Sequence, residues 1–290
     1  MEREADIPLE DSLKDSLLLT PTEAAALLEP FSSCDISDGL HRLGEPDAYG
    51  HLADISLVAP HVCSDDGGST VMDTRICGPA YTIGFVARGS TGTTKEGLEQ
   101  QKQQEQKQQQ EQPKQQHHMD TVPPGSIVVI SAPPCAPNAV FGGLMAARCA
   151  ARGVRAVVVA GRVRDRKELL DLQHHCSLPV FAAGFSTLGA APFVQVDRVG
   201  SSITIHDRSA LLRQGSPSPF PQSVMVSTGD MIVADIEGVV RIPLSLVVRV
   251  AQICRQLAAI DARCLSDIRS GRSMTDTFAE HRTSREHSSK

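Results

Sequence analysis

Tryptophan is absent from this 290-residue chain, and aromatic residues make up only 3% of it. The core must therefore be built from valine, leucine, isoleucine and alanine. No apolar run approaches the ~18 residues that a membrane-spanning helix needs. A formal net charge of −6 argues against a general nucleic-acid or membrane-surface binder. We therefore expect a protein that binds neither nucleic acid nor membrane, with a length that fits one large domain or two small ones.

The chain also lacks a C-x-x-C pair and any cysteine spacing typical of a zinc site. Its eight cysteines are scattered, and most flank apolar runs, as small core residues do. The first residues, MEREADIPLEDSLKDSLLL, are acidic and lack the basic and apolar segments of a secretory signal. We therefore expect reduced thiols and a cytoplasmic location.

The most informative stretch is NAVFGGLMAARCAARGVRAVVVAGRVRDRKE, residues 138–168. Two glycines precede a run of good helix formers at 144–152, and Gly153 stands where a helix C-cap is expected. Residues 154–160 form a continuous β-branched run that ends at Gly161, a pattern typical of a fully buried parallel strand. The stretch predicts a glycine turn, a helix, a strand and a second turn that carries Arg164 and Asp165.

The lengths of these segments predict where the two turns meet. About ten helical residues carry the chain roughly 15 Å one way, and about six strand residues return it roughly 20 Å. With residues 126–130 as the preceding strand, the unit is a right-handed βαβ crossover in an α/β fold. Both turns then lie at the carboxyl edge of the sheet, where open α/β sheets bind ligands.

Three chemical features are predicted at this edge. Arg164 offers a charged planar fork for a carboxylate or an enolate oxygen. Asp165 offers a hard oxygen ligand for Mg²⁺ or Mn²⁺. The free N–H groups at the start of the helix form an anion site backed by the helix dipole; they belong to Gly142, Gly143, Leu144 and Met145. The features suit a small 2-oxo acid chelated to a metal, and the alternative is that Arg164 and Asp165 are an ordinary surface turn pair.

The same residues resemble a family motif. Gly143, twenty intervening residues, Arg164-Asp165 and then Glu168 match the pattern G-x20-R-D-x2-E/D of the RraA-like family. This family includes the 4-hydroxy-4-methyl-2-oxoglutarate aldolases, or class II pyruvate aldolases. Further segments fall in the family's order: CDISDGLHRLG (34–44), GPAYTI (78–83), PPGSIVVI (123–130), LPVFAAG (178–184) and GDMIVADIEGVVRIP (229–243). The resemblance covers about residues 28–259, apart from one insertion.

The resemblance implies a fold, a site and a reaction. The fold would be the swivelling β/β/α type, assembled as a homotrimer or a hexamer of two trimers, with sites at subunit interfaces. The backbone at 142–145 would hold the substrate carboxylate, Arg164 the keto or enolate oxygen, and Asp165 the metal. No His in the motif is placed to act as the base, so we expect a water or hydroxide beside the metal to do so, with Glu168 as its orienting partner. The implied activity is retro-aldol cleavage to pyruvate, or decarboxylation of oxaloacetate, through a metal-stabilised enolate.

Two departures and one rival function accompany this resemblance. Gly143 stands where many aldolase members carry an acidic residue that positions water, and Ala160 replaces an Asp that often precedes the glycine of the turn. Both put the rate and the substrate in question more than the site. The rival is a non-catalytic regulator, because the family also contains proteins that inhibit the endonuclease RNase E by binding it.

The domain organisation follows from composition. Residues 20–268 are expected to form a single RraA-like domain, flanked by flexible tails at 1–19 and 269–290. The Gln-rich segment 89–118 is too polar to bury a core and is expected to be a disordered insertion. His117 and His118 at its end form a poor metal-ligand pair.

Other elements are predicted outside the central stretch. Helices are expected at 21–28, from Ser32 or Ser33 onwards, and at 243–262. Asp35 and Asp38 lie on the second helix, either as helix-start carboxylates or, by resemblance, near a neighbouring subunit's site. Strands are expected at 76–86, 178–183, 193–205 and 224–240. Asp235 serves a turn or is a minor site candidate.

Overall fold

The structure, a computed structural model, describes residues 19–45, 48–58, 61–63, 69–71, 74–89, 116–207 and 222–282. Two predictions therefore fall largely outside the described residues, the N-terminal tail and the Gln-rich insertion. The last part of the predicted C-terminal tail, residues 283–290, also lies outside them.

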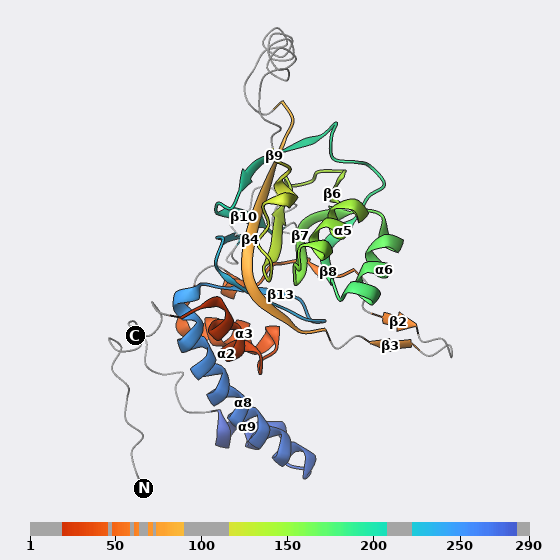
Figure 1. The fold of residues 1–290 in the computed structure, drawn as a ribbon. Helices are drawn as coiled ribbons and strands as arrows, with labels where there is room; N and C mark the ends of the chain where they lie inside the picture. Colours follow the sequence, from red (N-terminus) through yellow and green to blue (C-terminus); the bar gives the residue numbers. More distant parts are fainter. Residues whose placement is uncertain are drawn as a thin grey trace, which may run out of the picture.

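One mixed sheet organises the molecule (Figure 1). Its strands follow the order β1-β8-β7-β5-β4-β12-β13, with β6 added to β7 and β9 added to β4. The parallel strands are β4 (Ile76–Ala87), β5 (Ile127–Ser131), β6 (Ala139–Phe141), β7 (Ala156–Val163) and β8 (Val180–Phe185). The antiparallel strands are β1 (Ser56–Leu57), β9 (Val194–Val199), β12 (Met231–Ala234) and β13 (Val239–Ile242).

The predicted βαβ unit is confirmed, and it continues into a second one. Strands β5 and β7 run parallel from the pair Ile127 and Ala156 to the pair Ser131 and Ala160. Between them lies α5 (Gly143–Ala151), and α6 (Arg166–Cys176) connects β7 to β8. Gly153 follows α5 with φ +70°, a left-handed conformation that a glycine adopts without strain. The carboxyl ends of β5, β7 and β8 therefore meet at one edge of the sheet.

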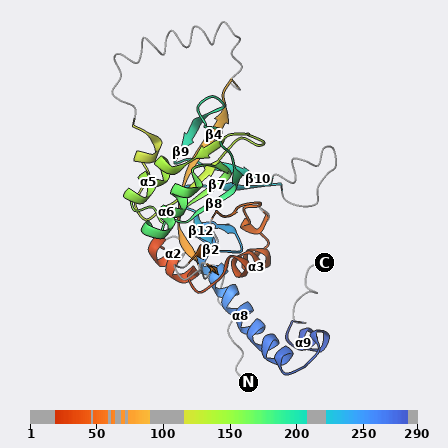
Figure 2. The same ribbon diagram turned by 90° about the vertical axis from the view of Figure 1, so that its right-hand side faces the viewer.

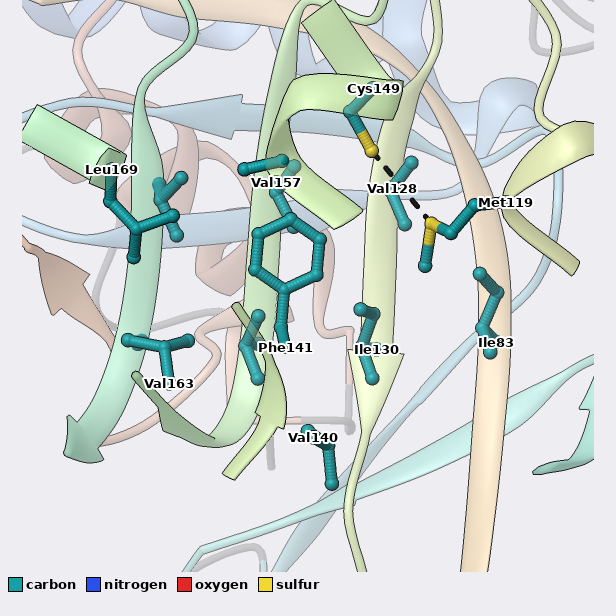
Figure 3. Packing of buried hydrophobic residues seen from close by; sticks show 14 of the residues in the cluster. Ile83, Met119, Val128, Ile130, Val140, Phe141, Cys149, Val157, Val163 and Leu169 are labelled. Carbon is teal, nitrogen blue, oxygen red and sulfur yellow. Dashed lines mark hydrogen bonds between the residues drawn. The ribbon is translucent and has the colours of Figure 1, made fainter. Parts of the chain in front are cut away.

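The sheet lies between a layer of helices and a β-hairpin. Helices α5 and α6 cover one face, where Val128, Ile130, Val157 and Leu169 are fully or almost fully buried (Figure 3). The hairpin of β10 (Ile203–His206) and β11 (Ser223–Val226) packs on the other face. Most of the buried side chains are aliphatic, as the scarcity of aromatic residues predicts. The order hairpin, sheet, helices is the β/β/α arrangement that the resemblance implies.

A third apolar cluster joins helices from the first and the last parts of the described chain. Helices α2 (Pro21–Leu28), α3 (Ser33–Leu43) and α8 (Val247–Arg269) pack against β12 and β13 (Figure 2). Ser32 caps α3, and Asp35 completes a capping box by accepting from the Ser32 backbone N–H at 2.9 Å. Asp35 is therefore a helix-start carboxylate, one of its two predicted roles.

Regular secondary structure extends beyond two predicted boundaries. Helix α8 reaches Arg269, and α9 (Met274–His281) follows, in a segment that the sequence assigns to a flexible tail. Its N-terminus is capped by Ser273, whose hydroxyl accepts from the Asp276 N–H. The 3₁₀ turn η2 (His118–Asp120) likewise lies inside the domain, with Met119 buried, rather than in a solvated Gln tract.

The remaining short elements are η1 (Ala48–Gly50), β2 (His61–Cys63), β3 (Ser69–Val71) and η3 (Leu244–Leu246). Among the described residues, no helix is long and apolar enough to cross a membrane.

Candidate functional site

The site forms where two turns meet at the carboxyl edge of the sheet. Strand β6 ends at Phe141 and leads through Gly142 into α5, while β7 leads through Arg164 and Asp165 into α6. The Arg164 N–H donates to the Phe141 carbonyl at 3.1 Å and fastens one turn to the other. The two segments that the sequence places at one edge are therefore in direct contact.

Asp165 is held in an unusual backbone conformation. Its φ of +60° and ψ of +47° are left-handed, which is uncommon for a residue other than glycine, although Asp and Asn tolerate it best. Its Oδ2 atom accepts the Gly143 N–H at 3.0 Å and lies 3.5 Å from Arg164 Nε. Strained backbone of this kind is concentrated at functional sites.

Side chains of the second turn and of α6 pack closely against both glycines of the first turn. A Cβ atom on Gly142 would lie 2.6 Å from Asp165 Oδ2 and 3.1 Å from Arg164 Cγ. A Cβ atom on Gly143 would lie 3.0 Å from Glu168 Cβ. The stem of Glu168 therefore occupies the space that a side chain at position 143 would need.

A cavity of about 200 Å³ opens between these turns, and we call it the RD cavity. Five of the predicted site residues line it, namely Gly142, Leu144, Met145, Arg164 and Asp165. Gly143 and Glu168 do not line the cavity and lie behind the residues that do. The sequence did not predict four further lining residues, which are Ala139, Val140, Phe141 and Ala190.

The missed residues come from short or irregular segments. Strand β6 has only three residues, too few for a recognisable alternation. The loop after β8 reaches the cavity because the Ala139 N–H donates to the Leu188 carbonyl at 2.9 Å. A Cβ atom on Gly189 would lie 2.9 Å from Arg164 Nη1, so this loop also lies against the arginine. The Ser, Gly and Pro residues after β8 predict a loop, but not where it lies.

The helix N-terminus offers fewer free donors than the sequence predicts. The first hydrogen bond within α5 runs from the Ala146 N–H to the Gly142 carbonyl, so the preceding N–H groups have no partner in the helix. The Gly143 N–H already donates to Asp165. The N–H groups of Leu144 and Met145 therefore remain for a substrate anion.

Other candidate residues have structural roles. Asp235 is buried and accepts the Ser33 N–H at 2.7 Å and the Ser33 hydroxyl at 2.6 Å. It therefore ties the turn between β12 and β13 to α3. His118 packs edge-on against Phe85, and burial, with His117 beside it, lowers its pKa to about 4.

Among the described residues, one group of three potential metal ligands is found, and it lies away from the RD cavity. Asp267, Glu280 and His281 converge where α8 meets α9. Arg272 pairs with both carboxylates of this group, and His281 Nε2 lies 2.9 Å from Asp267 Oδ2. Hydrogen bonds from His281 and Arg272 lower the pKa of Asp267. The cluster is therefore an ion-pair network that joins the two helices.

Comparison with known protein families identifies the chain. The family model described as RraA-like, Aldolase/RraA, matches residues 33–241. The chain belongs to this family. The match extends from the start of α3 to β13 and includes both turns of the RD cavity.

Solved structures with the same fold support this assignment. An uncharacterised protein from Pseudomonas syringae pv. tomato str. DC3000 is similar with a TM-score of 0.61 and 21% identity, over 89% of this chain and 99% of that one. RraAS2 of Streptomyces coelicolor, an unusual member of the RNase ES inhibitor RraA protein family, has a TM-score of 0.56 and 18% identity, over 86% of this chain and 96% of that one. At these identities the likeness shows the Aldolase/RraA fold alone.

Proposed function

We propose that this Aldolase/RraA protein is a divalent-metal-dependent carbon–carbon lyase acting on small 2-oxo acids. Its reactions would be retro-aldol cleavage of 4-hydroxy-4-methyl-2-oxoglutarate to pyruvate and decarboxylation of oxaloacetate. The observation that carries the proposal is the convergence of Arg164, Asp165 and the α5 N-terminus on one cavity. This grouping offers an anion site, a fixed cation and an oxygen ligand within reach of one small molecule.

Different groups of the protein bind different parts of the substrate. The N–H groups of Leu144 and Met145, with the helix dipole behind them, bind the carboxylate next to the keto group. The guanidinium of Arg164, which lies against the loop at Gly189, stabilises the negative charge that develops on the keto oxygen. Such fixed donors act more strongly on the developing enolate than on the neutral ketone.

Asp165 fits a divalent cation such as Mg²⁺ or Mn²⁺. Its contacts with the Gly143 N–H and with Arg164 Nε both use the Oδ2 atom. The Oδ1 atom takes part in neither contact, and the Asp165 side chain is 38% exposed. Mg²⁺ is usually held by one or two carboxylates, with waters and substrate oxygens completing its shell. The cavity beside Asp165 leaves room for such ligands. When bound, the cation would supply Lewis-acid polarisation of the keto oxygen.

Proton transfer distinguishes the two reactions. Retro-aldol cleavage needs a base for the 4-hydroxyl, and Glu168 is an exposed carboxylate beside Gly143 that would orient the accepting water or hydroxide. Decarboxylation needs the same enolate stabilisation without that base. Because no carboxylate stands at position 143 itself, we expect oxaloacetate to be the faster substrate.

The test is pyruvate release from both substrates, with Mg²⁺ or with a chelator, measured against protein-free controls because Mg²⁺ alone decarboxylates oxaloacetate. The informative variant is Asp165→Asn, since Asn tolerates the left-handed backbone and preserves the shape while weakening metal binding. Arg148→Gln, which removes a surface arginine paired with Asp120, is the matched control. We expect metal-dependent release that is lost in Asp165→Asn and kept in Arg148→Gln. Background release in every sample would refute the lyase for these substrates.

The second candidate function is a non-catalytic regulator that binds a ribonuclease. The fold shared with RraAS2 and the exposed apolar side chains at this edge of the sheet, Leu144 and Leu188, favour it. Capture of a ribonuclease by the wild-type protein, without metal-dependent turnover, would place this candidate first. We further propose that the chain assembles as a homotrimer or a hexamer, as Aldolase/RraA proteins commonly form oligomers.

A further inference from the structure

A second cavity lies on the opposite face of the sheet from the RD cavity. It measures about 30 Å³ and is enclosed by the ends of β5, β7 and β8 together with β10. Ala160, Ala183 and Ile205 line it and belong to the apolar cluster on the β10–β11 side. It shares no lining residue with the RD cavity, so the two are separate sites.

Arg162 gives this cavity an unusual charge. Its Nε atom is buried without a hydrogen-bond partner, while its Nη1 donates to the Phe185 carbonyl at 3.0 Å. A guanidinium is always protonated in proteins. None of the lining residues is an Asp or a Glu, so no lining side chain neutralises this charge. A buried charged donor without an acceptor is unfavourable, because its hydration is lost and no protein group replaces it.

The remaining wall is narrow and mainly apolar. Ser131 contributes a hydroxyl group, and Cys135 closes one side from a turn in which the Ala136 N–H donates to the Pro133 carbonyl. Cys135 has a φ of +62°, a left-handed conformation that is rare for residues other than Gly, Asn and Asp. The chain thus holds a left-handed turn against a guanidinium whose buried Nε–H group has no partner, and left-handed backbone at residues other than glycine is concentrated at functional sites.

We propose that this cavity binds the carboxylate group of a small organic acid. One carboxylate oxygen would accept from Arg162 Nε, and the second would face the hydroxyl group of Ser131. A water-sized site needs roughly 10–15 Å³, so this cavity has room for about two oxygen atoms. A neutral water would satisfy the Nε–H group but not the charge, whereas a carboxylate does both.

Arginine Nε–H resonances in ¹H–¹⁵N spectra report on the site directly. The Arg162 signal is assigned by its loss in Arg162→Lys and followed while sodium formate or acetate is added against sodium chloride at equal ionic strength. We expect a saturable shift with formate and acetate, no shift with chloride, and no change at Arg148 Nε, which already pairs with Asp120 at 2.6 Å. A site that responds equally to chloride, or an Nε–H group that contacts only water and never shifts, would overturn the proposal.

Two variants extend the test. Ala160→Asp introduces a carboxylate into the cavity wall and is expected to move the Arg162 Nε–H resonance without added acid and to abolish the titration. Arg162→Gln is expected to weaken binding at least about tenfold, measured by the relaxation of ¹³C-labelled formate. The formate measurement on Arg162→Gln tests the proposal even if Ala160→Asp fails to fold. Equal formate relaxation with wild type and Arg162→Gln would contradict the assignment.

Discussion

At the scale of single residues, the geometry of the RD cavity depends on the absence of a side chain at Gly142. Gly142 has an extended backbone with a φ of −159°, so any residue could adopt its conformation, yet a Cβ atom there would collide with Asp165 Oδ2. Gly142→Ala should therefore displace Asp165 and Arg164 without unfolding the protein. We expect turnover to fall about 100-fold, the usual effect of a misplacement near 1 Å.

The comparison variant for Gly142→Ala is Gly78→Ala. Gly78 is near the opposite edge of the sheet, and an added Cβ atom would lie 3.4 Å from its nearest neighbours, Arg155 Cδ and Ile127 Cγ1. Pyruvate release and thermal unfolding are measured for both variants. Equal activity in Gly142→Ala and Gly78→Ala would show that turnover does not depend on the position at which Gly142 allows Asp165 to lie.

The buried ion pair between Arg241 and Asp230 affects the stability of the protein rather than the RD cavity. Arg241 Nε lies 2.8 Å from Asp230 Oδ2, with the two side chains only 9% and 11% exposed. Arg241→Met leaves a buried carboxylate without its counter-ion, which typically costs about 3–5 kcal/mol. We expect the urea-derived free energy of unfolding to fall by this amount. The double variant Asp230→Asn/Arg241→Met should regain most of the loss, and an additive loss would contradict the pairing.

At the scale of elements, local patterns explain why part of the structure could be predicted. The unit β5-α5-β7-α6-β8 follows from valine-rich runs, helix formers and glycine stops, each of which acts within a few residues of chain. Strand β6 and the Gly189–Ala190 loop have no such periodicity, because tertiary contacts position them. Helix α9 contacts α8 through His281 and Asp267, and through Arg272, which pairs with Asp267 of α8 and Glu280 of α9. A polar sequence alone does not indicate these pairs.

The same distinction applies to the site. The pairing of Arg164 and Asp165 follows from the chain path and from the resemblance to the family. The capture of the Gly143 N–H by Asp165, and the position of Glu168 behind Gly143, depend on distances of about 3 Å that no spacing rule specifies.

The short turn η2 carries a pH-dependent contribution to stability. Burial lowers the pKa of His118 from 6.5 to about 4; His117 reinforces this shift, and Asp120 opposes it. As pH falls below about 6.5, the unfolded chain binds a proton that the folded chain does not, so the free energy of unfolding decreases. Each pKa unit corresponds to about 1.4 kcal/mol. Because the ring is partly exposed, we expect a loss of about 2 kcal/mol between pH 7 and pH 4.

His118→Phe isolates this effect. The substitution keeps an aromatic ring against Phe85 and removes the titrating group. Urea unfolding at a series of pH values should show a shallower pH dependence in His118→Phe than in wild type. Identical slopes would assign the acid sensitivity to other residues.

At the scale of the whole molecule, the surface beside the RD cavity bears on assembly. Leu144 is 90% exposed in the first turn of α5, although fully burying a leucine side chain is worth about 1.5–3 kcal/mol. Leu188, from the loop that reaches the same cavity, is 44% exposed. If copies of the chain associate at this edge, Leu144 is the side chain that gains most from the contact.

Leu144→Asp separates assembly from folding, because a carboxylate in the first turn of a helix is stabilised by the helix dipole. We therefore expect the variant to fold with unchanged or higher thermal stability as a monomer, whereas wild type sediments as a trimer or a hexamer. Leu265→Asp, at an exposed leucine of α8, is the matched control and should retain the wild-type assembly. Sedimentation velocity over a range of concentrations distinguishes these states. A monomeric wild type, or a Leu144→Asp variant that remains assembled, would refute association through this edge.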